Sequence, residues 1–172
     1  GAACAEVFAA AGANLILTAR RLERLEGMAQ ELNEQYGVQC LSFFCDVADK
    51  NSVRELFQAL EQKACHVDIL INNAGLALAM DKVQDGKVDD WEKMIDTNIK
   101  GLLYMTKQCV QGMIARNSGY IFNIASISSH HVYSGGTVYC ATKFAVDALS
   151  QGLRLDLLGT DIRVTQISPG AV

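Results

Sequence analysis

The chain has 172 residues, half of them hydrophobic, which is enough to bury one sizeable core and favours a single domain over residues 1–172. Its net charge of −4, with both signs mixed, excludes the strongly basic surface expected of a protein that binds nucleic acid or an anionic membrane. Six scattered cysteines without a Cys-x-x-Cys pair fit neither a zinc site nor a compact disulfide framework, so we expect reduced core residues in a cytoplasmic protein and no metal.

Apolar periodicity predicts alternating helices and strands along the whole chain. Helical spacing and good helix formers indicate helices at 2–11, 22–37, 52–62, 88–116 and 138–158. Short continuous apolar runs, typical of strands buried on both faces, occur at 14–18, 38–45, 67–71, 119–124 and 162–167. Alternation with short connections implies an α/β fold, a doubly wound parallel sheet with helices on both faces.

Polar, small and glycine residues gather directly after successive predicted strands. In an open parallel sheet, ligands bind beyond the carboxyl ends of the strands. Ordinary turn chemistry could explain any one of these groups, but together they outline one crevice. The groups are Ala19–Arg21, Asp46–Val47, Asn72–Gly75, Ala125–Ser126 and Ser168–Gly170.

Tyr139 and Lys143 stand four residues apart, so on a helix they share one face. A phenol with an ordinary pKa of about 10 is a poor acid or base near neutrality, and an adjacent ammonium favours the phenolate. The pair could therefore perform proton chemistry. The spacing alone leaves open a tyrosine in the core and a lysine that reaches solvent.

In this context the chain resembles the short-chain dehydrogenase/reductase family over nearly all of its length. That family places a catalytic serine thirteen positions before its tyrosine, at Ser126, and an asparagine in the preceding long helix, at Asn98. The resemblance implies hydride transfer between an alcohol and a nicotinamide. Tyr139 would move the hydroxyl proton, and Ser126 would hold the reacting oxygen. The motifs that carry the resemblance are Asn72-Asn73-Ala74-Gly75, Asn98, Ser126, Tyr139, Lys143 and Pro169-Gly170.

The remaining roles also follow from the resemblance. Lys143 would hydrogen-bond the nicotinamide ribose as well as favour the Tyr139 phenolate, and the backbone carbonyl of Asn98 would hold a water. A narrower likeness of 73–78, Trp91, 94–98 and 104–106 to the NADP-dependent 3-hydroxy acid dehydrogenase branch implies serine and related acids as substrates.

Other functions stay open at this point. A steroid, sugar or 3-oxoacyl substrate is one alternative, and a non-catalytic NADPH-binding scaffold on the same fold is another. His130 and His131 near Ser126 could suggest a serine hydrolase, but no G-x-S-x-G elbow surrounds that serine. We expect the two histidines to be loop residues that could line the substrate mouth with Met80 and Gly136, and we expect Cys140 and Trp91 to pack in the core.

Arg20, Arg21 and Arg24 lie at the start of a predicted helix, where the positive end of the helix dipole disfavours cations unless an anion binds there. The family carries an aspartate at the position of Ala19 when it uses NAD, so Arg20 and Arg21 here favour the 2′-phosphate of NADP. Partial compensation by Glu23 and Glu26 is the alternative. The remaining cofactor residues implied by the resemblance are Gly1, Asp46, Val47, Asn72, Ala74, Gly75, Tyr139, Lys143, Pro169, Gly170 and Val172.

The family's first strand and most of its glycine-rich turn would lie upstream of Gly1, and its substrate-covering segment would lie beyond Val172. We therefore expect a Rossmann-like domain truncated at both ends. Small and apolar residues from Phe144 to Leu153 form a stripe on the last long helix. Because this helix pairs across subunits in the resembled family, we expect a homotetramer with no nucleic-acid or membrane partner.

Overall fold

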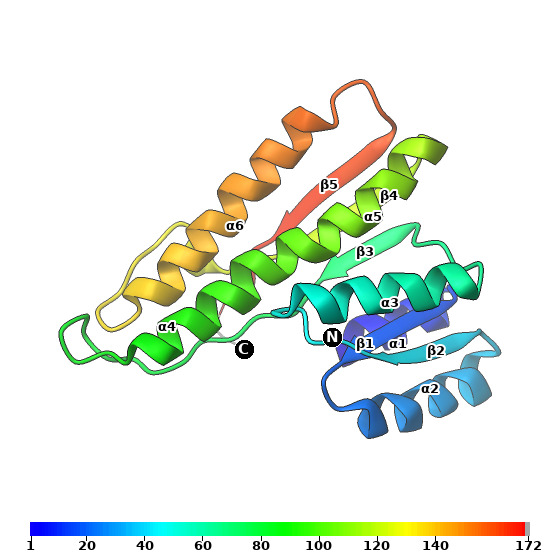
Figure 1. Ribbon diagram of the computed structural model, residues 1–172, viewed down its shortest axis with the longest axis horizontal. Helices are drawn as coiled ribbons and strands as arrows, with labels where there is room; N and C mark the ends of the chain where they lie inside the picture. The colour runs from blue at the N-terminus through cyan, green and yellow to red at the C-terminus, as the bar shows by residue number, and fades with distance from the viewer. Residues whose placement is uncertain (171–172) are drawn as a thin grey trace.

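The computed structural model describes residues 1–170 as alternating helices and strands (Figure 1). The predicted order of elements is confirmed, with boundaries that shift by at most two residues for most of them. The elements are α1 (Ala2–Ala10), β1 (Leu15–Ala19), α2 (Leu22–Tyr36), β2 (Cys40–Phe44), α3 (Lys50–Gln62), β3 (Ile69–Asn72), α4 (Val88–Ile95), η1 (Asp96–Gly101), α5 (Leu102–Arg116), β4 (Gly119–Ile124), η2 (Ile127–Ser129), α6 (Thr137–Asp156) and β5 (Ile162–Ile167).

All strand pairs are parallel, as the predicted doubly wound α/β fold requires, and they form two ladders. β1 pairs with β2, and β3, β4 and β5 pair in that order. Within residues 1–170, no strand lies between β1 and β3 to join the two ladders, and these two edges face a cavity of about 1220 Å³. Paired strands must lie roughly 4.7–4.9 Å apart, which is too close to leave such a cavity between them.

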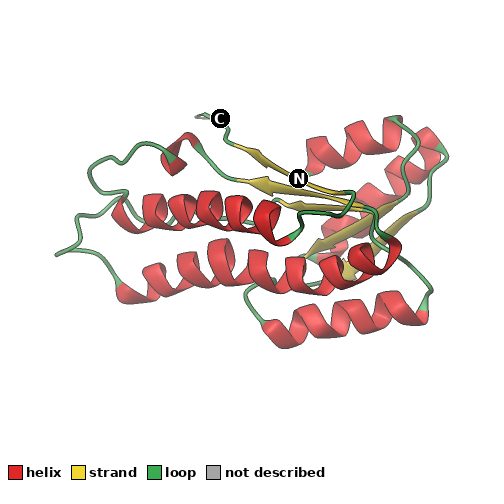
Figure 2. Cartoon of the chain, turned by 90° about the horizontal axis from the view of Figure 1, so that it is seen from above, coloured by secondary structure: helices red, strands yellow, loops and turns green. Residues whose placement is uncertain are grey.

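Helices cover both faces of the β1–β2 sheet, as a doubly wound arrangement requires. Leu15 and Leu17 pack against the core cluster of α1 and α2, whereas Ile16 packs against the cluster built around α3. This alternation follows from the two-residue period of a strand. The same side of the molecule that carries α3 also carries α5 and α6, which cover β3, β4 and β5 (Figures 1 and 2).

The predicted long helix at 88–116 is interrupted in its middle. A π-helical turn, η1, separates α4 from α5, and it contains Asn98. At its end Gly101 lies against the loop after β2, since a Cβ there would be 2.8 Å from Val47 Cγ2. Single π turns are rare and occur often at functional sites because they redirect side chains.

All six cysteines are free thiols. Cys40, Cys45 and Cys109 each belong to a different core cluster, which confirms these three as core residues. Burial raises the pKa of all three thiols, and that of Cys109 to about 12. Separately, no helix within residues 1–170 is long and apolar enough to cross a membrane.

Candidate active site

The carboxyl ends of β1, β2 and β3 bring most of the predicted nucleotide-side residues to one end of the large cavity. Ala19 and Asn72 are the last residues of their strands rather than the first loop residues, because the β1–β2 and β3–β4 ladders extend that far. The rest of the cavity is the slot between the β1 and β3 edges. Its strand-end lining includes Gly1, Arg20, Asp46, Val47, Asn72, Ala74 and Gly75.

Arg20 and Arg21 are exposed at the start of α2, where Arg21 occupies the N-cap position. Among the described residues neither guanidinium forms an ion pair, so Glu23 does not neutralise them through a direct contact. Asp46 follows β2, and its Oδ1 accepts a hydrogen bond from the Ala48 N–H at 3.1 Å. This carboxylate therefore shapes its own turn while it lines the cavity.

The Tyr139–Lys143 pair lies on α6, as the spacing predicted. Lys143 Nζ is 5.8 Å from the centroid of the Tyr139 ring. The Lys143 side chain does not reach solvent: the residue is 6% exposed, and its Nζ donates to the Ile124 carbonyl at 3.0 Å. Burial lowers the pKa of the Lys143 ammonium, because removal from water disfavours the charged form.

Ser126 follows β4 and is nearly buried. Its Oγ accepts from the Ser128 N–H at 3.1 Å, which fixes the oxygen and leaves the hydroxyl hydrogen as a donor. The next residue, Ile127, donates its N–H to the Pro169 carbonyl at 2.9 Å. The segment after β5 is thereby joined to the Ser126 loop, and the predicted Pro169 lies beside the serine rather than in the large cavity.

Asn98 is 2% exposed and uses its side chain entirely for protein contacts. Its Oδ1 accepts from the Leu76 N–H, and its Nδ2 donates to the Leu76 carbonyl, both at 2.9 Å. The same Nδ2 also donates to Thr142 Oγ1 at 3.0 Å. A Cβ at Gly75 would lie 3.4 Å from both Asn98 Oδ1 and Lys143 Nζ, so this glycine lets the backbone approach the pair closely.

Thr142 is the buried site residue that the sequence interpretation missed. In the sequence, Thr142 is only a hydroxyl residue one position before Lys143. Its hydrogen-bond partner, Asn98, is known only from the structure, where the π turn directs the Asn98 side chain towards α6. Gly170 is exposed after β5, and Val172 lies outside the described residues. Within residues 1–170 no group of three or more metal-ligating side chains occurs.

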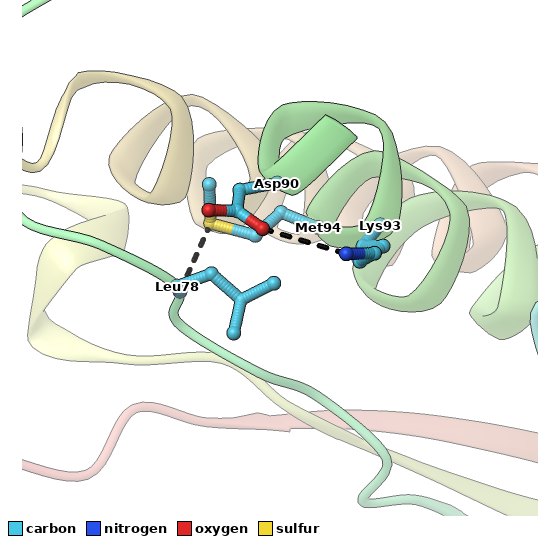
Figure 3. A network of polar contacts seen from close by, with 4 residues as sticks. All are labelled: Leu78, Asp90, Lys93 and Met94. Atoms are coloured by element: carbon cyan, nitrogen blue, oxygen red, sulfur yellow. Dashed lines mark hydrogen bonds and ion pairs between the residues drawn. The ribbon is translucent and has the colours of Figure 1, made fainter. Parts of the chain in front are cut away.

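The loop between β3 and α4 is fixed on the α4 side. The Leu78 N–H donates to the Met94 sulfur at 3.4 Å, and Asp90 and Lys93 form an exposed ion pair at 3.5 Å nearby (Figure 3). Further along, the Met80 carbonyl lies directly against Gly135. Met80 is exposed, so this loop and the start of α6 form one rim beside the Tyr139 helix.

The other residues of this rim are mostly as expected. His130 and His131 are exposed loop residues, Gly136 is covered by the Tyr133 ring, and Cys140 is fully buried. Trp91 is only half-buried, so the prediction that it belongs to the core is wrong: its indole packs against Gly86 in the loop.

A crevice beyond the carboxyl ends of parallel strands is where open α/β folds bind nucleotides, and Gly75 in its lining lies beside the buried Lys143. The family model for short chain dehydrogenases matches residues 1–172. The chain belongs to this family.

Among curated relatives, the NADP-dependent 3-hydroxy acid dehydrogenase of Escherichia coli strain K12 is 46% identical over 165 residues, 96% of this chain and 65% of that protein. The enzyme of the same description from Schizosaccharomyces pombe is 40% identical, over 97% of this chain and 64% of that protein. The chain thus spans just under two thirds of the length of these relatives. A solved closed form of serine dehydrogenase complexed with NADP+ superposes with a TM-score of 0.89 at 45% identity, covering 98% of this chain and 66% of that one.

Proposed function

We propose that this protein is an NADP-dependent oxidoreductase that transfers a hydride between its cofactor and the CH–OH carbon of a small 3-hydroxy acid such as serine. The observation that carries the proposal is the position of Lys143. Its Nζ lies beside Gly75 of the strand-end crevice and 5.8 Å from the centroid of the Tyr139 ring, and it donates to the Ile124 carbonyl, two residues before Ser126. Similarity to proteins that are described as NADP-dependent 3-hydroxy acid dehydrogenases and as a serine dehydrogenase supports the substrate class.

The residues present fit a dinucleotide phosphate. The guanidinium groups of Arg20 and Arg21, which form no ion pair within residues 1–170, supply the positive charge that a 2′-phosphate needs. In this proposal Asp46 and Val47 contact the adenine, and the close approach of Gly101 to Val47, which holds their loop, supports this role. Gly75 keeps the β3 end free of side-chain bulk beside Lys143 Nζ, so a nicotinamide ribose could approach the ammonium.

Each catalytic side chain has a defined task in this proposal. The bound nicotinamide supplies hydride chemistry. Tyr139 takes the hydroxyl proton during oxidation and returns it during reduction. The hydroxyl of Ser126, held by the Ser128 N–H, donates to the reacting oxygen. Lys143, which donates a hydrogen bond to the Ile124 carbonyl, provides positive charge to the tyrosine and a hydrogen-bond donor to the ribose.

Asn98 contributes differently from the other three. Its side chain is occupied by Leu76 and Thr142, so any water that it holds must bind its backbone. Its amide group instead holds the loop after β3 against the π turn. We keep the backbone carbonyl of Asn98 as the water site and assign its side chain to positioning.

We also propose a homo-oligomer, a tetramer, in the cytoplasm. Phe144 is 43% exposed on α6, and Leu155 on the same helix is 68% exposed, so apolar surface there lacks a partner within the described chain. Free thiols in three separate core clusters suit a reducing compartment. Sedimentation of the intact protein as a monomer at micromolar concentration would refute the assembly.

The deciding experiment measures turnover by the intact protein with NADP+ and a panel of serine, threonine stereoisomers, 3-hydroxypropionate-type acids, steroids and sugar alcohols. We expect activity with the 3-hydroxy acids, and a loss of about 10²–10⁴-fold in kcat for Tyr139→Phe, the range for one general acid–base group. Activity confined to steroids or sugars would overturn the substrate class. NADPH binding without any turnover would favour the scaffold function, and a Tyr139→Phe variant with normal kcat would refute the mechanism.

A further inference from the structure

Two residues one turn apart on the α4–η1 segment hold the backbone of the loop after β3. Met94 accepts from the Leu78 N–H (Figure 3), and Asn98 bonds both backbone groups of Leu76. Both side chains are buried. The loop directly after Gly75 therefore takes its position from Met94 and Asn98.

Asn98 is in turn held by α6 through a single hydroxyl. Thr142 Oγ1 accepts from Asn98 Nδ2 at 3.0 Å and donates to the Tyr139 carbonyl at 2.7 Å. Thr142 is 1% exposed, so water cannot replace either bond. One oxygen thus connects the first turn of α6, which carries Tyr139, to the residue that holds the loop.

We propose that Thr142 is a positioning residue that holds Tyr139 in register with the Gly75–Leu76 backbone through Asn98. This role rests on the proposed function. The hydroxyl is required because it must accept one hydrogen bond and donate another at the same time. A valine has the same shape but would leave a buried Asn98 N–H without its Thr142 acceptor and free the tyrosine turn to shift.

The same helix provides a matched control. Ser150 is 0% exposed, its Oγ donates to the Val146 carbonyl at 2.7 Å, and it accepts from Asn123 Nδ2 at 2.9 Å. This is the same bonding pattern as that of Thr142, two turns further along α6 and away from Tyr139. Ser150→Ala therefore removes an equivalent buried hydroxyl with a comparable effect on folding.

The test compares steady-state kinetics of the intact protein with Thr142→Val, Thr142→Ser and Ser150→Ala. We expect Thr142→Val to lower kcat by about 10- to 100-fold, the scale of a misplaced reacting group, with KM for NADP+ within about twofold of the original. Thr142→Ser retains the hydroxyl and should restore kcat to within about threefold, while Ser150→Ala keeps the original kcat. An equal loss of kcat in Thr142→Val and Ser150→Ala would overturn the proposal.

A second measurement does not depend on turnover. Amide hydrogen exchange at Leu76 should speed up in Thr142→Val but not in Ser150→Ala, because only the former releases the Asn98 amide. Unchanged exchange at Leu76 would refute the positioning role, even if no substrate is found and the proposed function fails. If Thr142→Val does not fold, Thr142→Ala is read by the same two assays.

Discussion

The β1–β2 half and the β3–β5 half of this molecule hold their ligand-facing ends in different ways. In the first half, cluster packing positions exposed side chains such as Arg20 and Arg21. In the second half, buried polar side chains bond to one another across elements. Asn72 Nδ2 donates to both Thr106 Oγ1 and Asn123 Oδ1, and Asn123 Nδ2 donates to Ser150.

The difference matches what each half has to do. Binding a phosphate needs charge at a surface and tolerates modest movement, whereas proton and hydride transfer need reacting atoms held within fractions of an ångström. A satisfied buried polar network specifies one geometry, because any shift leaves a donor or acceptor without a partner. This network lies in the half that carries Tyr139 and Lys143 and fixes how β3, β4 and α6 pack, whereas the Asn98–Thr142 bonds are the ones that we propose to position the reacting residue.

The largest expected effect tests the role of the β1–β2 half in discriminating NADPH from NADH. Arg21→Ala should weaken NADPH binding by about 10- to 100-fold, corresponding to the 1.5–3 kcal/mol typical of a hydrogen bond to a charged group. NADH binding should stay unchanged, since NADH lacks the 2′-phosphate. Fluorescence titration with both cofactors measures this, and Arg163→Ala, which removes an exposed arginine on β5, is the control. Equal weakening for NADH and NADPH would show that the arginine supports the fold and not phosphate recognition.

The next effect concerns stability. Asn123→Leu removes the centre of the network and should lower the free energy of unfolding by about 1–3 kcal/mol, because Asn72 loses an acceptor in the core. The contrasting variant lies on β2: Ser42 Oγ is buried without a hydrogen-bond partner among residues 1–170, so Ser42→Ala should be neutral or stabilising. Denaturant unfolding of both variants compares the two halves directly. An equal loss in the two variants would contradict the distinction between them.

The smallest effect is a change in how the free energy of unfolding varies with pH. Burial lowers the pKa of Lys143 from its ordinary value of 10.5, so the unfolded chain binds more protons, and stability rises with pH up to that value. Lys143→Met should therefore raise the free energy of unfolding near pH 7, partly offset by the lost bond to Ile124, and the gain should shrink towards pH 10.5.

Lys100 is the comparison, because its pKa is shifted in the opposite direction from that of Lys143. Its hydrogen bond to Asp96 raises the pKa of the Lys100 ammonium, so its contribution is present below the ordinary value and is lost as pH rises through the raised pKa. The difference in free energy of unfolding between the original protein and Lys143→Met should therefore shrink as pH rises towards 10.5, whereas the difference for Lys100→Met should change only above 10.5, where the stabilising contribution of Lys100 is lost. The same pH dependence for both differences would contradict the assignment of burial as the cause at Lys143.

The sequence predicted the order of elements and most of the site because both depend on local signals. Apolar periodicity located the strands, and the four-residue spacing of Tyr139 and Lys143 placed them on one helix face. The π turn at Asp96–Gly101 carried no such signal, since its register depends on Leu76 and Val47, which lie in other segments. Thr142 was missed for the same reason.

The pairing partner of each strand also could not be predicted from apolar periodicity. A buried strand such as β3 looks alike whether its neighbour is β1 or β4, because apolar runs report burial and not pairing partners. Asn72 was assigned to a loop for its polarity, but its pairing with Asn123 extends the ladder by one residue. A polar residue inside a strand is explained once its buried partners are known.

The distribution of thiols offers a way to observe how this molecule opens. Cys40, Cys45 and Cys109 are each enclosed by a separate group of apolar side chains, and Cys140 adjoins Tyr139 with no exposed surface. An alkylating reagent reacts with such a sulfur only after the surrounding side chains have separated, so the labelling rate at each position reports how often that part of the structure opens. Peptide mapping of the four sites over time would give the order in which the nucleotide side, the middle and the catalytic helix come apart, without an introduced probe.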